Sequence, residues 1–418
     1  MPDRTQITVE RIGHHGDGIG AGPVFIPGGL PGERVSGVLE GDVLTDIRIE
    51  VPVADRVAAP CTHYKSCGGC QMQHANDVFV AKWKQAIVEA ALESKGLTGQ
   101  FRPIHVSPIA SRRRATFSAR RTKKGATAGF HARKSDTIIE TPKCAVIDAK
   151  LKSAIPIVRE LALLGASRKG EISVTVTTSD AGLDVAVDGG KELDTALRLG
   201  LARLAETAGL ARLTWSNEMV AMRAAPFQMF GAARVVPPPG AFLQATPDGE
   251  AVLRAAVTEI CASSIRCADL FAGSGTFTLP LAERAHVHAV ESSADMLTAL
   301  NNGWRHARGL KQVTTEARDL FRRPLLAEEL SNYDAIVLDP PRAGADAQVK
   351  QIAGSGVPKL AYVSCNPVSF ARDAAHLVQA GYRLNWVQVV DQFRWSRHVE
   401  LVAYFSLSHM SDDRKGIW

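Results

Sequence analysis

The feature that most constrains the fold is a series of short apolar segments between residues 266 and 364, separated by stretches of helical composition. Uninterrupted apolar segments of this length are typical of strands buried on both faces. Strands that alternate regularly with helices predict a parallel sheet covered by helices on both sides. The expected strands are 266–271, 287–291, 313–319, 335–339 and 360–364.

Two further apolar segments, 386–390 and 399–405, are joined by a short link without a helical pattern. Such a link predicts that the two segments pair antiparallel, with the last strand running against the others. We therefore expect residues 236–418 to form an α/β, Rossmann-like domain with a parallel sheet and an antiparallel last strand. Pro237-Pro238-Pro239-Gly240 marks the beginning of this domain.

The first half of the chain has a different pattern. Residues 1–58 contain short β-type segments broken by Gly and Pro, which predict a small β-barrel of the OB type. Residues 59–235 combine a clear helix, 77–92, with hairpin-like segments such as 172–176, and we interpret them as a central α+β domain. A length of 418 residues agrees with a multidomain chain, because single cores rarely grow so large.

Composition excludes several classes of protein. Apolar residues make up 45% and charged residues 22%, which is typical of a folded globular chain. The chain has seven Cys, an odd number, and its first residues lack the apolar core of a signal peptide. Both features predict a protein of the reducing cytoplasm. No apolar run approaches the roughly 18 residues needed to cross a bilayer, so no membrane partner is expected. The net charge of +6 permits a polyanionic partner without demonstrating one.

A glycine-rich turn, Asp269-Leu270-Phe271-Ala272-Gly273-Ser274-Gly275-Thr276, ends the first strand of the expected sheet. Its glycines let the backbone approach a ligand at the carboxyl ends of the strands. Glu291 ends the second strand, where a carboxylate accepts ribose hydroxyls, and Asp319 ends the third, near an adenine ring. Position 278, where a dinucleotide site has a third glycine, is Thr278. The pattern favours S-adenosylmethionine as the ligand of this site. The alternative is that the carboxylates at the strand ends only cap helices and bind no ligand.

Two motifs end the fourth and fifth strands, Asp339-Pro340-Pro341-Arg342 and Ser364-Cys365-Asn366-Pro367. Glu400 stands at the start of the last strand. If that strand is antiparallel, its start lies at the same edge of the sheet as the carboxyl ends of the others. We therefore expect Cys365, Asp339 and Glu400 to share one crevice. The alternative for Cys365 is a packing residue in a tight turn.

A thiol, a carboxylate and a methyl donor in one crevice suggest methylation of uracil at C5. C5 is not nucleophilic enough to take a methyl group directly, but a thiolate adding at C6 places electron density on C5. A general base must then remove the C5 proton before the thiolate leaves. We assign Cys365 as nucleophile and Glu400 as base, while Asp339 positions the donor or the base edge. Arg342 or the sulfonium of the donor would lower the pKa of the thiol.

These motifs resemble those of S-adenosylmethionine-dependent RNA 5-methyluridine methyltransferases, in particular the iron–sulfur members that act on 23S ribosomal RNA. Phe242-Leu243-Gln244, the 269–277 turn, the 339–344 and 364–367 segments and His398-Val399-Glu400 carry the resemblance. The resemblance implies a TRAM-like barrel, Cys365 as nucleophile and Glu400 as base. The residues expected to contact the cofactor are Gln244, Phe271, Gly273, Thr276, Glu291, Asp319 and Asp339.

The chain departs from the family pattern in three places. Thr276 stands where members usually have Asn, and it donates one hydrogen bond instead of the amide's pair. The segment 393–400 reads Phe-Arg-Trp-Ser-Arg-His-Val-Glu instead of the usual Phe-Pro-x-Thr-x-His-Val-Glu. The barrel segment 1–58 has five Arg, no Lys and nine acidic residues. With a net charge of −4, the barrel does not attract RNA electrostatically. We expect it to contact RNA through its shape or to contact a protein instead.

Cys61, Cys67 and Cys70, with Cys144 further along the chain, offer four thiolates, three of them around Gly68-Gly69. Glycines leave room for a cluster and let N–H groups point at sulfur. A zinc site uses the same ligands, and spacing separates the two poorly. The resemblance implies a [4Fe-4S] cluster; structural zinc and thiols that pack without a metal are the alternatives. Cys261 and Cys267 are expected in the core.

Residues 112–134 contain nine Lys or Arg and no acidic residue, with Phe117, Phe130 and His131 interleaved. Such density favours contact with phosphates and bases of single-stranded or looped RNA. Lys124-Gly125 is expected at a hairpin tip. The residues predicted to bind RNA are Arg112, Arg113, Arg114, Arg120, Arg121, Lys123 and Lys124.

The sequence thus predicts a monomeric cytoplasmic enzyme that extrudes a uridine from folded RNA and methylates C5, with 23S ribosomal RNA as the expected substrate. One alternative is methylation of transfer RNA. Cytosine C5 methylation commonly pairs two cysteine motifs, and Asp339-Pro340-Pro341-Arg342 supplies none. Another alternative is a non-catalytic iron–sulfur factor that binds RNA or assists ribosome assembly, in which Cys365 and Glu400 would be idle.

Overall fold

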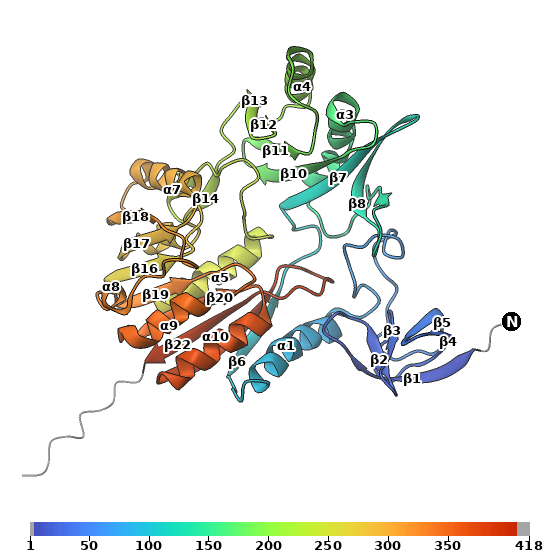
Figure 1. Ribbon diagram of the computed structural model, residues 1–418, viewed down its shortest axis with the longest axis horizontal. Helices are drawn as coiled ribbons and strands as arrows, with labels where there is room; N and C mark the ends of the chain where they lie inside the picture. The colour runs from blue at the N-terminus through green and yellow to red at the C-terminus, as the bar shows by residue number, and fades with distance from the viewer. Residues whose placement is uncertain (1–3, 408–418) are drawn as a thin grey trace, which may run out of the picture.

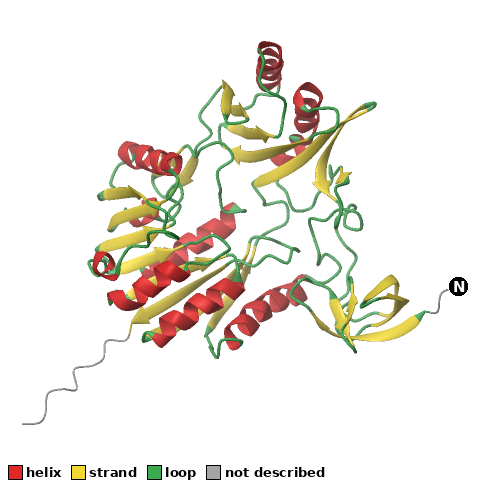
Figure 2. Cartoon of the chain, viewed as in Figure 1, coloured by secondary structure: helices red, strands yellow, loops and turns green. Residues whose placement is uncertain are grey.

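The computed structural model describes residues 4–407, which form three parts (Figures 1 and 2). Residues 1–3, and 408–418 at the end of the expected third domain, lie outside the described residues. The first part is a closed barrel with strand order β1-β2-β3-β5-β4, as predicted from the first segment. Val9, Ile26, Val35 and Leu44 fill its core. The strands are β1 (Thr5–Ile12), β2 (Gly18–Gly20), β3 (Val24–Ile26), β4 (Arg34–Glu40) and β5 (Val43–Val51).

The second part is a seven-stranded sheet with the order β13-β12-β11-β10-β7-β8-β9. Helices α3 (Ile155–Gly165) and α4 (Thr195–Thr207) pack on it around a common apolar core. The short helix α2 (Ala149–Ser153) precedes α3, and a hairpin of β14 (Gln228–Phe230) and β15 (Ala233–Val235) leads to the third part. The strands are β7 (Arg114–Thr122), β8 (Gly125–His131), β9 (Ile138–Ile139), β10 (Glu171–Ser179), β11 (Gly182–Asp188), β12 (Arg212–Trp215) and β13 (Glu218–Met222).

The third part is an eight-stranded sheet with the order β18-β17-β16-β19-β20-β22-β21-β6. The five predicted strands pair parallel, and the last strand, β22, pairs antiparallel with both β20 and β21. Both sequence predictions are therefore confirmed. The strands are β6 (Phe101–Val106), β16 (Arg266–Leu270), β17 (His286–Glu291), β18 (Val313–Ala317), β19 (Ala335–Leu338), β20 (Lys359–Ser364), β21 (Tyr382–Asp391) and β22 (Leu401–Leu407).

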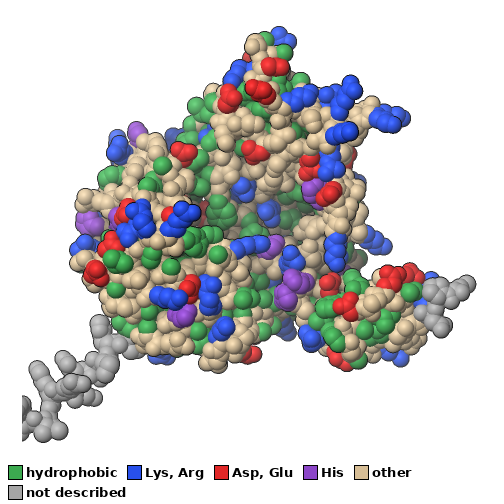
Figure 3. Space-filling model, viewed as in Figure 1, with side chains coloured by type: hydrophobic (Ala, Val, Ile, Leu, Met, Phe, Trp, Pro, Cys, Tyr) green, Lys and Arg blue, Asp and Glu red, His purple; other side chains and the backbone are tan. Residues whose placement is uncertain are grey.

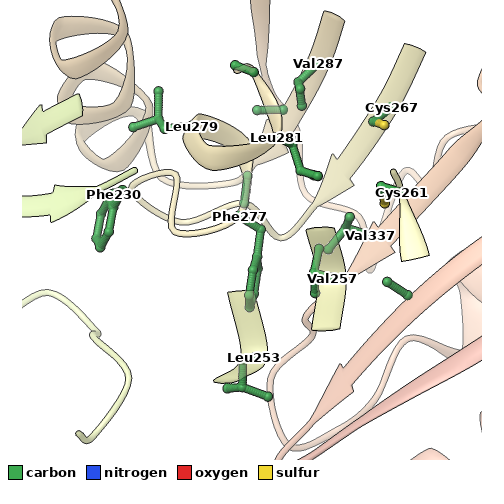
Figure 4. Packing of buried hydrophobic residues seen from close by; sticks show 14 of the residues in the cluster. Phe230, Leu253, Val257, Cys261, Cys267, Phe277, Leu279, Leu281, Val287 and Val337 are labelled. Atoms are coloured by element: carbon green, nitrogen blue, oxygen red, sulfur yellow. The ribbon is translucent and has the colours of Figure 1, made fainter. Parts of the chain in front are cut away.

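Both faces of this sheet are covered, because successive side chains of a strand point to opposite sides. Val337 packs on the face covered by α5 (Pro247–Ile260), α6 (Thr278–Leu281) and α7 (Ala294–His306). Ile336 and Leu338 pack on the face covered by α1 (Asp77–Glu93), α8 (Ala327–Leu330), α9 (Asp346–Ser355) and α10 (Pro367–Gln379). Cys261 and Cys267 lie among apolar side chains of the first face, as expected (Figure 4).

Helix α1 and strand β6 lie with the third part, although the sequence analysis grouped them with the central domain. Strand β6 forms the edge of the eight-stranded sheet, parallel to β21. Helix α1 contributes the fully buried Lys84, whose Nζ donates to Asp391 and to the carbonyls of Phe393 (2.9 Å) and His398 (3.0 Å). The segment 391–400, which ends at the expected base Glu400, is therefore held by a helix from the first quarter of the chain.

Among residues 4–407, we find no helix with the length and apolar character that crossing a membrane requires.

Candidate active site

A cavity of about 960 Å³ opens where the parallel strands end at their carboxyl termini. The strand order reverses between β16 and β19, and ligands of open α/β sheets bind at such a switch point. Figure 3 shows the molecule hollowed between the central part and the third part. Residues from both parts line the cavity, including Cys61, Arg114, Glu291, Cys365 and Glu400.

One end of the cavity has the form of a nucleoside site. Phe271 (φ +64°) and Gly273 (φ +55°) hold the turn after β16 in the left-handed region. This geometry directs the Gly273 N–H to Oε2 of Glu291 at 3.1 Å, while Oε1 accepts from Ser292 and from the Ser293 N–H. The Glu291 carboxylate is thus fixed, and each oxygen still has capacity to accept a ribose hydroxyl.

Aromatic rings form the wall beside this carboxylate. The ring centroids of Phe271 and Phe321 are 5.5 Å apart, and both side chains line the cavity. Asp319 lies two residues beyond β18 and accepts from the Phe321 N–H at 3.0 Å, which fixes the loop that carries this ring. The arrangement offers apolar contact to a flat ring and a carboxylate at its edge.

Five of the seven residues predicted to contact the cofactor line the cavity: Phe271, Gly273, Glu291, Asp319 and Asp339. The other two, Gln244 and Thr276, are absent from its wall. Gln244 is 2% exposed because its side chain is turned toward Gln392 inside the protein. Thr276 is half-buried and follows the two glycines of the turn.

The other expected reaction residues meet at the middle of the cavity. Cys365 follows β20 directly, and Glu400 directly precedes β22. Both line the cavity together with Asp339, so the inference from the antiparallel last strand is confirmed. Asn366 caps α10 by accepting from the Val368 N–H at 3.1 Å, and Pro367 begins the helix. The turn is tight, as the alternative interpretation expected, but it presents the thiol to the cavity instead of packing it in the core.

Burial and neighbouring charge shift the pKa values of this group. Burial raises the pKa of Asp339 to about 7, and the nearby Asp269 adds to this effect. Burial, followed by the charge of Asp339, raises the pKa of Glu400 well above its usual value. Burial raises the pKa of Cys365 to about 11; Glu400 and Asp339 act in the same direction, and Arg342 opposes them. Without a cationic ligand, the thiol and the carboxyls are all held toward their protonated forms.

The comparisons agree with this geometry. A family model described as tRNA (Uracil-5-)-methyltransferase matches residues 253–407. A protein of Rhizobium meliloti (strain 1021) named an uncharacterized RNA methyltransferase is 42% identical over 95% of this chain and 98% of its own length. The 23S rRNA (uracil(1939)-C(5))-methyltransferase RlmD of Chromohalobacter salexigens is 31% identical over 94% of this chain and 87% of its own.

The chain belongs to the RNA uracil-C5 methyltransferases. The fold of the methyltransferase is also that of a solved structure, the Pyrococcus abyssi tRNA (uracil-54, C5)-methyltransferase in complex with S-adenosyl-L-homocysteine. The TM-score is 0.75 at 20% identity, covering 96% of this chain and 99% of the other. The family's reaction uses S-adenosylmethionine, in agreement with the nucleoside-like end of the cavity.

The four cysteines predicted to bind a metal line the same cavity. Burial, together with the charges of Cys144, Cys67 and Cys61, raises the pKa of Cys70 to about 12, which indicates that the four thiols are neighbours. The Gly69 N–H points at Sγ of Cys67 (3.4 Å). Within residues 4–407, however, no three His, Cys, Asp or Glu side chains are arranged to hold a metal ion. The geometry does not confirm the predicted metal site.

Gly68 has a different role from the one expected for it. A Cβ atom there would lie 2.9 Å from the carbonyl oxygen of His131, the last residue of β8. The glycine is therefore required where the cysteine loop passes the backbone of β8, and it need not make room for a cluster.

The seven residues of the basic stretch that were predicted to bind RNA lie in different surroundings in the methyltransferase. Arg121, Lys123 and Lys124 are exposed at the tip of the β7–β8 hairpin, which begins its return at Gly125 as predicted. Figure 3 shows Lys and Arg side chains gathered there. Arg112 and Arg114 line the cavity, and Arg120 pairs with Glu171 at 2.7 Å.

Arg113 is the exception, because it cannot reach RNA. Its side chain is buried, pairs with Glu250 of α5, and donates from Nε to the Gln244 carbonyl at 3.1 Å. Arg113 instead joins the central part to the third part beside the cavity. Its prediction as an RNA-binding residue was wrong, because the sequence does not indicate that Glu250 lies beside it.

Sequence reasoning also missed residues that support the reaction centre. The Nδ1 atom of His398 accepts from the Arg342 guanidinium at 2.7 Å. Burial, together with the charge of Arg342, lowers the pKa of His398 to about 4, so this imidazole is neutral and keeps Arg342 beside the thiol. His398 was part of a recognised motif, but nothing in the motif indicated its partner. The buried Gln392 was missed as well.

The raised pKa of Cys365 leads to a prediction about its reactivity. With a pKa of about 11, roughly one thiol in 10⁴ is ionised at pH 7. Alkylation of Cys365 by iodoacetamide should therefore accelerate about tenfold per pH unit between pH 7 and 10. S-adenosylmethionine, whose sulfonium is positive, should accelerate it at pH 7 more than S-adenosylhomocysteine, whose sulfur is a neutral thioether. Mass spectrometry of the Cys365 peptide measures this, and equal rates with both ligands would contradict it.

Proposed function

We propose that the enzyme methylates C5 of a specific uridine in 23S ribosomal RNA through a covalent bond between Cys365 and C6. The observation that carries this proposal is that Cys365, Asp339 and Glu400 line one cavity with the Phe271–Glu291 nucleoside site. We therefore expect the nucleophile, the general base and the methyl donor to act on a single uracil ring bound in this cavity. A paired and stacked base is closed to a thiolate, so the target must be extruded from the RNA.

The residues then have distinct tasks. The Cys365 thiolate adds to C6, and C5 of the enolate attacks the methyl group that S-adenosylmethionine supplies. Glu400 removes the C5 proton, and the electron pair of that C–H bond restores the ring double bond as the thiolate leaves. Arg342 favours the thiolate by its charge. In its ionised form, Asp339 attracts the cationic donor into the cavity.

The choice of RNA rests on the comparisons. The relative named as acting on 23S rRNA is 31% identical, whereas the structure named as acting on tRNA is 20% identical and shows the fold alone. Nucleoside mass spectrometry on size-separated RNA from a deletion strain tests the proposal. We expect one 5-methyluridine to disappear from 23S rRNA. A loss confined to tRNA would establish the alternative substrate, and an unchanged content in both would overturn the function.

We further propose that Cys61, Cys67, Cys70 and Cys144 hold a [4Fe-4S] cluster. The donor set fits it: four neighbouring thiols share one cavity wall, and the N–H groups of Gly69 and Val146 point at Sγ of Cys67 and Cys144. One zinc ion needs four sulfurs within about 2.3 Å of a point. A cluster of several irons accepts ligands that lie further apart.

Metal analysis of the anaerobically purified enzyme provides the corresponding prediction. We expect about four iron and four sulfide per chain, with brown colour. Cys70→Ser should lower the iron content and the melting temperature, whereas Cys261→Ser, a core change outside the cavity, should lower only the melting temperature. A colourless protein that contains zinc and no iron would contradict the cluster and favour the zinc alternative.

The exposed hairpin tip is the part of the basic stretch that we expect to contact phosphates. Replacing Lys123 and Lys124 with alanine should weaken RNA binding and reduce the slope of log affinity against log salt by about 1.4, roughly 0.7 per lost contact. Filter binding at several salt concentrations measures this. Alanine at Lys95 and Lys350, exposed lysines on other surfaces, provides the control. An unchanged slope in the hairpin variant would remove this contact from the proposal.

A further inference from the structure

Gln392 connects the expected base to a second buried amide. Its Nε2 donates to Oε2 of Glu400 at 3.2 Å and to Oε1 of Gln244 at 2.5 Å. Its Oε1 accepts from the Ala245 N–H at 2.7 Å. Gln392 is 1% exposed, so water does not compete for these bonds.

The backbone determines which way this amide faces. A main-chain N–H can only donate, so the group facing Ala245 must be the amide oxygen of Gln392. The two hydrogens on Nε2 must then face Gln244 and Glu400. Oε1 of Gln244 is in turn an acceptor, which leaves Nε2 of Gln244 as a donor; within residues 4–407, no group accepts a hydrogen bond from it. One peptide N–H thereby sets the orientation of both glutamines.

The surrounding structure is adapted to this side chain. A Cβ atom on Gly249, in the first turn of α5, would lie 2.9 Å from Cβ of Gln392, so the glycine makes room for it. The Val390 N–H donates to the Glu400 carbonyl at 2.8 Å, which brings the end of β21 beside the start of β22. Residues 392 and 400 therefore approach each other through both backbone and side chain.

We propose that Gln392 is the positioning residue that holds the Glu400 carboxylate for removal of the C5 proton. This inference rests on the proposed function and concerns its last step. An anionic carboxylate gains more from the amide N–H than a neutral carboxyl does, so Gln392 supports the basic form of Glu400. Because Gln392 has no part in the attack on C6 or in the transfer of the methyl group, its loss should slow proton removal selectively.

The test is Gln392→Met, which keeps the volume of the side chain and removes its amide. Gln388→Met on the same strand is the matched control, because it also loses one amide bond, to the Pro103 carbonyl at 3.1 Å, but does not contact Glu400. RNA tritiated at C5 of uridine, with methyl-labelled donor, gives two rates in a single turnover. One is the appearance of methyl label in RNA, and the other is the release of tritium to water.

We expect Gln392→Met to release tritium ~10- to 100-fold more slowly, the loss expected for one hydrogen bond to a charged group. Methyl label should enter RNA within about threefold of the wild-type rate, leaving a methylated covalent complex. Tritium release within twofold of wild type would overturn the proposal. So would equal slowing of both steps together with a lower melting temperature, which indicates a structural role. If the wild type itself forms no covalent complex, the proposed function fails instead.

Discussion

Replacing Cys365 with alanine should abolish methyl transfer, with a rate on the order of 10⁴-fold or more below wild type. Without the thiolate, C5 has no added electron density, and the two nearby carboxyls, Asp339 and Glu400, are held toward their protonated forms and are poor substitutes. The half-buried thiol contributes little to the core, so the variant should fold normally. Transfer of labelled methyl groups to RNA measures the loss.

RNA that contains 5-fluorouridine identifies the step that is lost. Fluorine at C5 cannot leave as a cation, so the wild-type enzyme should remain covalently bound to this RNA after methyl transfer. Cys365→Ala should form no such complex, while Cys261→Ala, in the core, should form it as wild type does. A complex that persists in Cys365→Ala would remove this residue as nucleophile. No complex with the wild type would favour a non-catalytic RNA-binding protein.

Replacing Glu400 with glutamine should reduce turnover by about 10²- to 10⁴-fold, the range expected when a general base is lost. The carboxamide keeps the shape of the residue but cannot accept the C5 proton. Addition of the thiolate and methyl transfer do not need this base, so the first turnover should stop at the methylated covalent complex. Denaturing electrophoresis of the enzyme with labelled RNA detects this complex.

The pH dependence separates this role from a structural one. Burial and Asp339 raise the pKa of Glu400, so the fraction in the basic form increases with pH up to that raised value. Release of the C5 proton by the wild type should therefore accelerate as pH rises toward that raised value, whereas slow release by Glu400→Gln should not follow this profile. Glu259→Gln, an exposed change on α5, is the control. Parallel profiles for wild type and Glu400→Gln would exclude Glu400 as the base.

The arrangement of the reaction centre could be predicted because it depends on sheet geometry. The five strands between residues 266 and 364 alternate with helices, which predicts that they are parallel. Their carboxyl ends therefore lie along one edge of the sheet. A short link before 399 implied an antiparallel strand, whose start returns to that edge. Cys365 and Glu400 could therefore be placed together although 35 residues separate them in the chain. The glycine turn and Glu291 followed from the same reasoning.

Other features could not be predicted, because they depend on contacts between distant segments. Nothing near residue 101 indicates that β6 joins β21 at the far edge of another part of the fold. Gln392 is an ordinary polar residue in the sequence, and its importance arises from Gln244 and Gly249, which are more than 140 positions away. Arg113 stands in a basic run, and its burial becomes evident only once Glu250 is beside it.

The buried pair of Lys84 and Asp391 has a consequence for protein synthesis. The two residues are 307 positions apart, and at about 5–20 residues per second the ribosome needs roughly 15–60 s to make the intervening chain. During this time α1 and β6 exist without the strand and the carboxylate that complete their burial. The segment that is synthesised late, with β21 and Asp391, therefore completes the burial of α1 and β6, which are synthesised early. The residues that form the catalytic part are thus not one contiguous stretch that begins at residue 236. A fragment that begins there would lack both the edge strand and the lysine that fastens its base-bearing loop.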